Sequence, residues 1–242
     1  METRDARRSV VVGGASGIGA AVVDHQRRAG LTVVSWDVRG DSDVECDVAD
    51  PASVEWAIEE TLGRIGVPEL VTVTAGVGHS ATLLDVTPDE WDRVMRVNTR
   101  GPMLVMRGFA RAMIDAGVPG SIIATSSVSA RLADPTMGTY CASKAALSMV
   151  VAVAAAEWGR HRIRVNAVGP GVTNTPMLGG APEESKGLPA VAGRTALGRI
   201  GQADDIAEVV ASLHELGGVT GKVVECDGGL AGHSPIDPMG LG

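Results

Sequence analysis

The stretch SVVVGGASGIG, residues 9–19, decides the fold of this chain. The β-branched run at residues 9–12 predicts a strand, and a helical pattern of apolar residues follows at residues 20–29. Between them, Gly13, Gly17 and Gly19 let the backbone turn tightly and approach a pyrophosphate at the amino end of the helix, where free N–H groups and the helix dipole favour anions. Glycine clusters occur in many tight turns, but strand, glycine turn and helix in this order predict a dinucleotide-binding unit.

The composition of the whole chain favours a single domain. With 242 residues, of which 45% are hydrophobic, the chain can bury one sizeable core, so we expect one domain over residues 1–242. The 21 Lys and Arg against 29 Asp and Glu give a net charge of −8, which predicts no binding to nucleic acid or anionic lipid. Residues 1–8 are polar and glycines follow, so we expect neither a signal peptide nor a membrane span, and a cytoplasmic location.

The cysteines and histidines carry no metal or disulfide pattern. Cys46, Cys141 and Cys226 are odd in number and far apart in the sequence, which favours reduced thiols over a disulfide framework or a zinc site. The five histidines have no ligand spacing, and we assign no metal.

A tyrosine and a lysine lie at the carboxyl end of a second informative segment, residues 126–144. Tyr140 and Lys144 are four residues apart, and the Ala-rich run after them predicts a helix that carries both side chains on one face. A free phenol has a pKa of about 10, and a neighbouring ammonium would lower it. On its own this pair is typical of an ordinary helix surface. However, Tyr140 is the only tyrosine in the chain, and the glycine turn lies upstream, so we interpret the pair as catalytic.

An acidic residue ends the second predicted strand. Residues 31–36 read as a strand, and Asp37 follows it, eighteen residues after Gly19. A carboxylate at this place accepts hydrogen bonds from the adenosine ribose and repels a 2′-phosphate, which favours NAD over NADP; the alternative is a strand-end turn carboxylate. Residues 38–44 are too few for the helix that normally connects two parallel strands, so we expect a loop there.

The remaining pattern alternates strands and helices. Helix starts are indicated by Asp50-Pro51 and by the capping box that begins at Thr87 with Pro88. The order of elements predicts a Rossmann-type, doubly wound α/β fold with a mostly parallel, seven-stranded sheet flanked by helices. The other strands are expected at residues 45–47, 70–74, 120–125, 163–168 and 222–226, and the later helices at residues 140–158 and 204–216.

From residue 10 to residue 230, the chain resembles the short-chain dehydrogenase/reductase family. The resemblance rests on the spacing Gly13-x-x-x-Gly17-x-Gly19, on the Tyr140-x-x-x-Lys144 pair and on a serine thirteen residues before Tyr140. That spacing selects Ser127 rather than Ser126. The family pattern implies a catalytic tetrad of Asn98, Ser127, Tyr140 and Lys144, in which Asn98 bends a helix and starts a proton relay to solvent.

The resemblance also implies which residues bind NAD. Val73 and Thr74 depart from the family, in which two asparagines are usual at these positions. By resemblance, NADP users of the family carry a basic residue at the position of Asp37 or the next one, and the next residue here is Val38, although Arg39 follows. The implied cofactor-binding residues are Gly13, Ser16, Gly17, Ile18, Gly19, Asp37, Asp47, Val48, Ala75, Gly76, Tyr140, Lys144, Pro170, Val172 and Thr175.

Substrate contacts are expected on the loops around Tyr140. We assign Ser129, Met137 and Met177 to the substrate side, with His79 as a further candidate, and interpret residues 177–200 as a substrate lid. Arg131 either pairs with a substrate carboxylate or is a solvated loop arginine. Small residues along the helix at 140–158 imply, by resemblance, a subunit interface and a homotetramer, and residues 231–242 read as an extended tail.

Together these observations predict an NAD-dependent oxidoreductase that interconverts a small-molecule secondary alcohol and a ketone. Two alternatives remain open: an NADPH-dependent reductase of 3-oxoacyl carrier proteins, and a dinucleotide-binding protein without catalysis. Asp37 and the charge of −8 count against the first alternative, and the presence of both Tyr140 and Lys144 counts against the second.

Overall fold

Seven parallel strands form the central sheet, as predicted. The computed structural model describes residues 7–38, 40–178 and 188–232. The strand order is β3-β2-β1-β4-β5-β6-β9, and every neighbouring pair is parallel. The strands are β1 (Arg8–Val12), β2 (Thr32–Asp37), β3 (Val44–Glu45), β4 (Leu70–Val73), β5 (Gly120–Thr125), β6 (Ile163–Pro170) and β9 (Val223–Cys226). A short parallel pair of β7 (Thr173–Asn174) and β8 (Gly201–Gln202), which we did not predict, lies apart from this sheet.

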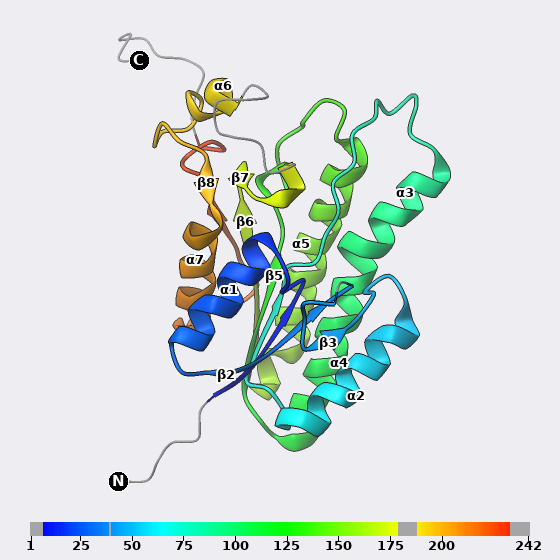
Figure 1. Cartoon of the computed structure of the whole chain (residues 1–242), viewed down its shortest axis with the longest axis vertical. Coiled ribbons are helices and arrows are strands. Elements are labelled where there is room, and N and C mark those ends of the chain that lie inside the picture. Colours follow the sequence, from blue (N-terminus) through cyan, green and yellow to red (C-terminus); the bar gives the residue numbers. More distant parts are fainter. Residues whose placement is uncertain (1–6, 39, 179–187, 233–242) are drawn as a thin grey trace.

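Helices cover both faces of the sheet (Figure 1). On one face lie α1 (Gly17–Arg28) and α7 (Ala203–Glu215), and on the other α2 (Pro51–Ile65), α4 (Gly101–Ala116) and α5 (Gly138–Trp158). Alternate residues of the strands supply the two cores: Val11 and Ile123 pack with α1 and α7, whereas Val10 and Ile122 pack with the other helices. The fold is therefore one doubly wound domain whose strands all end at the same edge.

The predicted helix starts are the observed ones. The Asp50 carboxylate accepts hydrogen bonds from the N–H groups of Ala52 and Ser53 and caps α2. Thr87 and Glu90 form the reciprocal capping box that opens α3 (Pro88–Met95). Each cap satisfies N–H groups that the first helical turn cannot bond internally.

The connection between β2 and β3 contains no helix in the part that the structure describes, as expected. Asp43 stabilises this short connection, because its Oδ2 accepts hydrogen bonds from the Ser35 N–H at 2.8 Å and the Ser35 hydroxyl at 2.7 Å. The same carboxylate oxygen lies 2.8 Å from an Arg27 Nη2 of α1. The tight return leaves the carboxyl ends of β2 and β3 uncovered by a crossover helix.

Helix α5 and the turn after it form a long apolar segment. Residues Gly138–His161 are long and apolar enough to cross a membrane by length and composition alone. In the structure, however, Leu147 and Val151 are buried in the core, and α5 packs on β6. A core helix passes the same composition test, so this feature carries no argument for a membrane span.

The expected lid and tail are described only in part. Of residues 177–200, the structure describes a 3₁₀ turn at Pro176–Leu178, the short helix α6 (Leu188–Ala192) and the turns that follow it. Residues 179–187 of the lid and residues 233–242 of the tail lie outside the described residues.

A buried histidine ties α7 to the centre of the sheet. His214 Nε2 lies 3.0 Å from the hydroxyl of Thr72 in β4, and Nδ1 lies 3.0 Å from the hydroxyl of Ser121 in β5. Burial lowers the pKa of this imidazole from its model-peptide value of 6.5 to about 3, and the nearby Arg164 guanidinium contributes. Between these two pH values the unfolded chain binds a proton that the folded chain does not.

We therefore expect the free energy of unfolding to fall as pH is lowered from 7 toward 3, with His214 alone contributing about 2 kcal/mol between pH 7 and pH 5. His214→Gln removes the titrating group, so its stability should depend less on pH in this window. Urea unfolding at both pH values measures the difference, with the partly exposed His161→Gln as control. Equal pH dependence of the wild type and His214→Gln would contradict the assignment.

Candidate active site

The glycine turn joins β1 to α1 at the carboxyl edge of the sheet. Gly13 and Gly17 have positive φ angles of 84° and 55°, which disfavour other residues. A Cβ atom at Gly19 would collide with the carbonyl oxygen of Gly13, so only glycine fits this close approach. Within the described structure the Ser16 side chain does not cap α1, and Ile18 packs against the core on the α1 side. The amino end of α1 is thus open to an anion.

Asp37 lies next to this turn at the end of β2. Its Oδ2 accepts a hydrogen bond of 3.1 Å from the N–H of Ala15, so the carboxylate also holds the glycine turn in place. Beside it, a pocket of about 510 Å³ opens at the ends of β2 and β3. Three of its six lining residues are acidic; the set is Val38, Glu45, Asp47, Asp50, Ser53 and Trp56. Arg39, the nearest basic residue in the sequence, lies outside the described residues.

Asp47 and Val48 follow β3 and differ in exposure. Asp47 is exposed and accepts a hydrogen bond from the N–H of Ala49, whereas Val48 is buried against Gly101, where a Cβ atom would lie 2.6 Å from the Val48 carbonyl oxygen. The pair therefore stands where β3 meets the start of α4. This position borders the pocket beside Asp37.

Thr74, which stands where the family usually has an asparagine, links two neighbouring strands. Its hydroxyl donates to the carbonyl oxygens of Val12 at 2.8 Å and Gly13 at 3.2 Å, which joins the end of β4 to the glycine turn. A threonine hydroxyl thus makes a cross-strand link at the place where the family usually has an asparagine. Ala75 and Gly76 follow directly, and a Cβ atom at Gly76 would lie 3.5 Å from Lys144 Nζ.

Ser126 and Ser127 face different ways at the end of β5. The Ser126 hydroxyl lies 2.7 Å from the Ser148 hydroxyl and also donates to the carbonyl oxygen of Lys144, so it joins β5 to α5. The Ser127 hydroxyl instead acts on the phenol of Tyr140, whose pKa it lowers. The structure therefore brings Ser127, and not Ser126, to the tyrosine.

Tyr140 and Lys144 share one face of α5, as the spacing indicated. Lys144 is buried, its Nζ donates a 2.7 Å hydrogen bond to the carbonyl oxygen of Thr125, and it lies 5.7 Å from the centre of the Tyr140 ring. Burial lowers the pKa of Lys144 to about 8.

The pKa of Tyr140 departs from our expectation. We expected the Lys144 ammonium to lower it, but in the structure burial raises the phenol pKa above its usual value. The hydrogen bond from Ser127 opposes this rise, while the charges of Cys141 and Asp134 add to it. Burial prevails because the phenolate loses more solvation than this single hydrogen bond restores.

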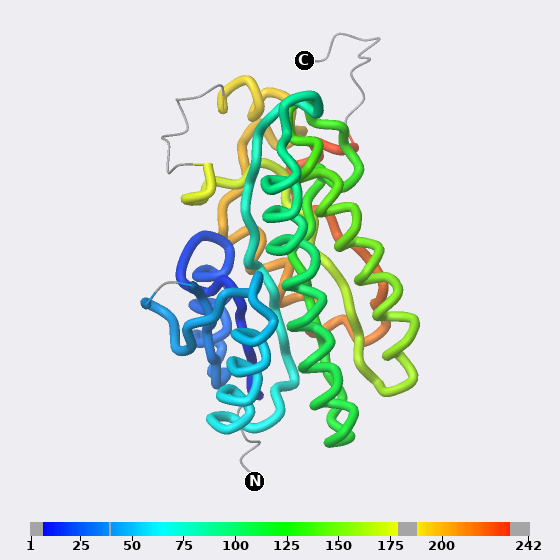
Figure 2. Tube along the Cα trace, turned by 90° about the vertical axis from the view of Figure 1, so that its right-hand side faces the viewer, coloured from blue at the N-terminus to red at the C-terminus, as the bar shows by residue number. Residues whose placement is uncertain are grey.

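Asn98 lies in a π-helical turn, Arg96–Arg100, between α3 and α4. Figure 2 shows α3 and α4 as one long, bent rod. The Asn98 amide is used within the protein: Oδ1 accepts from the Val77 N–H at 2.8 Å, and Nδ2 donates to the Val77 carbonyl at 2.9 Å and to the Ser143 hydroxyl at 3.1 Å. The side chain therefore fixes the turn after Gly76 against α5.

The sequence held a signal for this bend that we missed. In a regular α-helix the Asn98 carbonyl would accept a hydrogen bond from residue 102, but that residue is Pro102, which has no N–H. The missing donor leaves the Asn98 carbonyl oxygen without its α-helical partner. A carbonyl of this kind can bind a water molecule.

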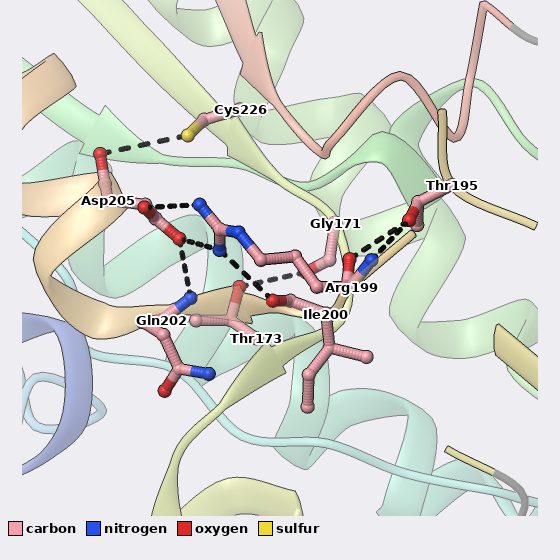
Figure 3. Close-up of polar contacts among 8 residues, drawn as sticks. All are labelled: Gly171, Thr173, Thr195, Arg199, Ile200, Gln202, Asp205 and Cys226. Atoms are coloured by element: carbon pink, nitrogen blue, oxygen red, sulfur yellow. Dashed lines mark hydrogen bonds and ion pairs between the residues drawn. The ribbon is translucent and has the colours of Figure 1, made fainter. Parts of the chain in front are cut away.

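The segment after β6 is braced by the contacts drawn in Figure 3. The Arg199 guanidinium makes two hydrogen bonds to Asp205, of 2.6 and 2.9 Å, and Asp205 also accepts from the Gln202 N–H at 2.8 Å. The Thr195 hydroxyl donates to the Arg199 carbonyl at 2.9 Å and accepts from its N–H at 3.1 Å. The turn before β8 is thus held to the start of α7.

This brace positions the segment that carries the predicted cofactor-binding residues Pro170, Val172 and Thr175. The Gly201 N–H of β8 donates a 2.9 Å hydrogen bond to the Val172 carbonyl, and β6 ends at Pro170. Thr175 then approaches the glycine turn, since a Cβ atom at Gly17 would lie 3.3 Å from the Thr175 Cβ. The carboxyl end of β6 and the amino end of α1 therefore face each other across one site.

The predicted substrate residues do not all gather. Ser129 is buried beside Ser127, and Met137 precedes α5 and pairs with Ala81 of the facing loop. Met177, by contrast, is 57% exposed and adjoins the undescribed residues 179–187. His79 lies 3.2 Å from Glu90 of the capping box.

Arg131 is a solvated loop arginine, the second of its two predicted roles, because its side chain is 67% exposed. Its Nη1 lies 3.1 Å from Oε1 of Glu225 in β9, so it forms an exposed ion pair between the loop after β5 and the last strand. Asp134, which we did not predict as a site residue, has a carboxylate that accepts a 2.6 Å hydrogen bond from the Ser129 hydroxyl. The Asp134-Pro135 dipeptide indicates a turn but not that contact.

Comparisons with known proteins identify the family. A family model described as enoyl-(acyl carrier protein) reductase matches residues 13–231. The chain is 34% identical to (3R)-3-hydroxyacyl-CoA dehydrogenase of Canis lupus familiaris, over 92% of this chain and 95% of that protein. It is also 34% identical to L-xylulose reductase of Mus musculus, over 93% of this chain and 96% of that protein.

Solved structures agree with these relatives. Gluconate 5-dehydrogenase of Burkholderia cenocepacia, in complex with NADP and tartrate, matches with a TM-score of 0.89 and 30% identity over 95% of this chain and 97% of that one. The 3-ketoacyl-(acyl-carrier-protein) reductase of Brucella melitensis, with NADH, matches with a TM-score of 0.85 and 27% identity over 93% and 98%. The chain belongs to the short-chain dehydrogenase/reductase family, and it is an oxidoreductase for small alcohol or ketone substrates that binds a nicotinamide dinucleotide.

The geometry fits such a cofactor. The open amino end of α1 and the close approach of Gly13 and Gly19 suit a pyrophosphate. Asp37 stands beside the turn for the adenosine ribose, and Thr175 lies next to Gly17, at the sheet edge that also carries Tyr140 and Lys144.

The contrast between the two serines gives a prediction. We expect Ser127→Ala to lower kcat by about 10²–10³, because the variant lacks the hydroxyl that acts on the phenol and that we expect to hold the reacting oxygen. Ser126→Ala removes only links to α5, so it should retain most of the activity and lose thermal stability instead. Steady-state rates and melting temperatures of both variants measure this. Equal losses of activity would show that Ser127 has no special role.

Proposed function

We propose that this protein is an NAD-dependent dehydrogenase that interconverts a secondary alcohol and a ketone, with Tyr140 as the general base and acid. The observation that supports this most is the position of Lys144 Nζ 5.7 Å from the centre of the Tyr140 ring, with the Ser127 hydroxyl acting on the phenol pKa. These groups lie at the strand edge that also carries the glycine turn. A proton acceptor is thereby close to a site for a hydride acceptor.

In alcohol oxidation, the Ser127 hydroxyl holds the carbinol oxygen and the Tyr140 phenolate takes its proton. A bound nicotinamide supplies the hydride acceptor for the carbinol carbon. In ketone reduction, the Tyr140 phenol gives the proton back to the oxygen. Lys144 binds the nicotinamide ribose, and the Asn98 carbonyl holds a water that passes the proton on to solvent.

The charges around Asp37 favour NAD over NADP. Asp37 would repel a 2′-phosphate directly, and Glu45, Asp47 and Asp50 add negative charge to the adjoining pocket. A phosphate there would meet four carboxylates at one end of the sheet. With NAD as cofactor, we expect oxidation to be the direction in the cell.

The relatives suggest two substrate classes. The name of one group is 3-hydroxyacyl-CoA dehydrogenase, which points to thioesters, and that of the other is L-xylulose reductase, which points to sugars and polyols. The main alternative function is an NADPH-dependent reductase of 3-oxoacyl carrier proteins, which the name of the similar structure from Brucella melitensis supports. A protein that binds the dinucleotide without catalysis is the other alternative.

The test is the rate of NADH formation with secondary alcohols, polyols and hydroxyacyl thioesters, each measured with NAD and with NADP. We expect turnover with NAD, and a loss of about 10²–10⁴ in kcat for Tyr140→Phe. Because burial raises the Tyr140 pKa, the phenolate fraction grows with pH, so NADH formation should accelerate toward alkaline pH. Ketone reduction, which needs the protonated phenol, should slow over the same range.

Three results would overturn parts of this proposal. A preference for NADPH in ketone reduction favours the 3-oxoacyl reductase. Cofactor binding without turnover of any substrate favours the non-catalytic protein. An active Tyr140→Phe variant excludes Tyr140 as the base.

We also propose a homo-oligomer, with a tetramer as the expected form. Ala145, Met149 and Val153 are spaced by four residues along α5 and form an exposed apolar stripe, in which Met149 is 65% and Val153 47% exposed. Small and apolar residues on one helix face allow close packing of a second copy.

Met149→Glu should therefore reduce the molecular mass in solution, because it would bury a charge at that interface. Light scattering after size-exclusion chromatography measures the mass. Ala52→Glu, on the exposed first turn of α2, is the matched control and should leave the mass unchanged. An unaltered mass for Met149→Glu would exclude this face as the interface.

A further inference from the structure

A serine and an aspartate form a short hydrogen bond beside the proposed catalytic residues. The Ser129 hydroxyl donates to Oδ2 of Asp134 at 2.6 Å, and Ser129 is only 8% exposed. The Ser129 N–H in turn donates to the Ser127 hydroxyl at 3.1 Å. Ser129 therefore joins a carboxylate to the serine that bonds Tyr140.

This arrangement leaves only hydrogen-bond acceptors. An ionised carboxylate cannot donate, so the single proton of the Ser129 hydroxyl is used in the bond to Asp134. What remains is the lone pairs of Ser129 Oγ and Oδ1 of Asp134, and none of the hydrogen bonds found among the described residues reaches these acceptors. A charge-assisted hydrogen bond is roughly twice as strong as a neutral one, so Ser129 does not easily turn its proton toward a ligand.

The Asp134 carboxylate acts on the reacting centre. Its charge is one of the causes that raise the pKa of Tyr140. The loop that carries Asp134 is held from the other side, because the Ala81 N–H donates to the Thr136 carbonyl at 2.8 Å and the Ser80 hydroxyl to the Thr136 hydroxyl at 3.0 Å. Figure 2 shows the two loops, before α3 and before α5, side by side. The carboxylate is therefore fixed near the phenol.

We propose that Ser129 and Asp134 form an acceptor pair that binds a substrate hydroxyl next to the reacting carbinol, so that the substrate is a vicinal diol or polyol rather than a 3-hydroxyacyl thioester. A thioester carbonyl can only accept hydrogen bonds, and it would face two acceptors with no proton between them. The hydroxyl of a diol donates its proton to the pair. This inference rests on the proposed function and assigns its substrate class.

The experiment compares three probes with the wild-type enzyme and NAD: butane-2,3-diol, butan-2-ol and the N-acetylcysteamine thioester of 3-hydroxybutanoate. The two alcohols share one carbon skeleton and differ by the neighbouring hydroxyl. We expect kcat/KM to be at least tenfold higher for the diol than for butan-2-ol, chiefly through KM, and higher for the diol than for the thioester.

Asp134→Asn tests the pair itself. The amide is the same size but can donate to Ser129, so the ratio of kcat/KM for diol to butan-2-ol should fall about tenfold. Any effect of the lost charge on Tyr140 is common to both alcohols and cancels in the ratio. Asp85→Asn, which removes a carboxylate bonded to Thr82 in the facing loop, is the matched control and should leave the ratio unchanged.

The outcomes separate the inference from the proposed function. An equal or lower ratio in the wild type, a ratio that Asp134→Asn does not change, or preference for the thioester overturns the acceptor pair while dehydrogenase activity stands. A lower ratio for a correctly folded Asp134→Asn, with an unchanged melting temperature, supports it. No NADH from any of the three probes, with NAD still bound, overturns both.

Discussion

A buried ammonium group needs polar partners, and the other parts of the site are arranged around the Lys144 side chain. Its Nζ reaches the Thr125 carbonyl at the end of β5, and Gly76 at the end of β4 lies close enough that a Cβ atom there would approach it to 3.5 Å. Asn98 holds these parts together, because its amide binds the backbone at Val77, just after Gly76, and the Ser143 hydroxyl on α5. Removing a cation from water is costly. The ends of β4 and β5, the helix α5 and the turn at Asn98 must therefore keep their relative positions, so that protein dipoles replace the water around Lys144.

Because of that requirement, the site forms only where the fold brings these elements together. The parallel sheet brings the ends of β1, β4, β5 and β6 to one edge, which supplies the glycine turn, the carbonyl for Lys144 and the segment at Val172. The helix α5 then places Tyr140 one turn before the lysine. Contacts such as the Thr74 hydroxyl on the carbonyls of Val12 and Gly13 hold neighbouring strand ends together.

The sequence was most informative where local chemistry determines geometry. The caps at Asp50 and Thr87, the glycine turn and the spacing of Tyr140 and Lys144 depend on neighbours within a few residues, and the structure has the helices, the turn and the shared helix face as predicted. The seven-stranded sheet follows from the same alternation of elements. What the sequence could not give depends on distant partners: the ion pair of Arg131 with Glu225 joins residues far apart in the chain.

The pKa of Tyr140 also depends on distant parts of the chain, since burial is a property of the whole fold. The Tyr140-to-Lys144 spacing correctly predicted that the two groups lie together. It did not predict the balance between desolvation and charge that sets the phenol pKa. The contact between Ser129 and Asp134 was missed for a related reason. A turn dipeptide indicates a bend, whereas the direction of a carboxylate depends on how two loops pack.

Pro102 has one more consequence. Most irregular helical turns rest on weak contacts that thermal motion can break, after which the ordinary hydrogen bond re-forms and the irregularity vanishes for a time. Here the N–H that would re-form it does not exist, because the nitrogen of Pro102 is closed into a ring. The absence of an α-helical donor for the Asn98 carbonyl is thus a covalent property of the chain, and local opening of the helix cannot remove it. The π-helical turn between α3 and α4 therefore has no regular α-helical alternative at this hydrogen bond.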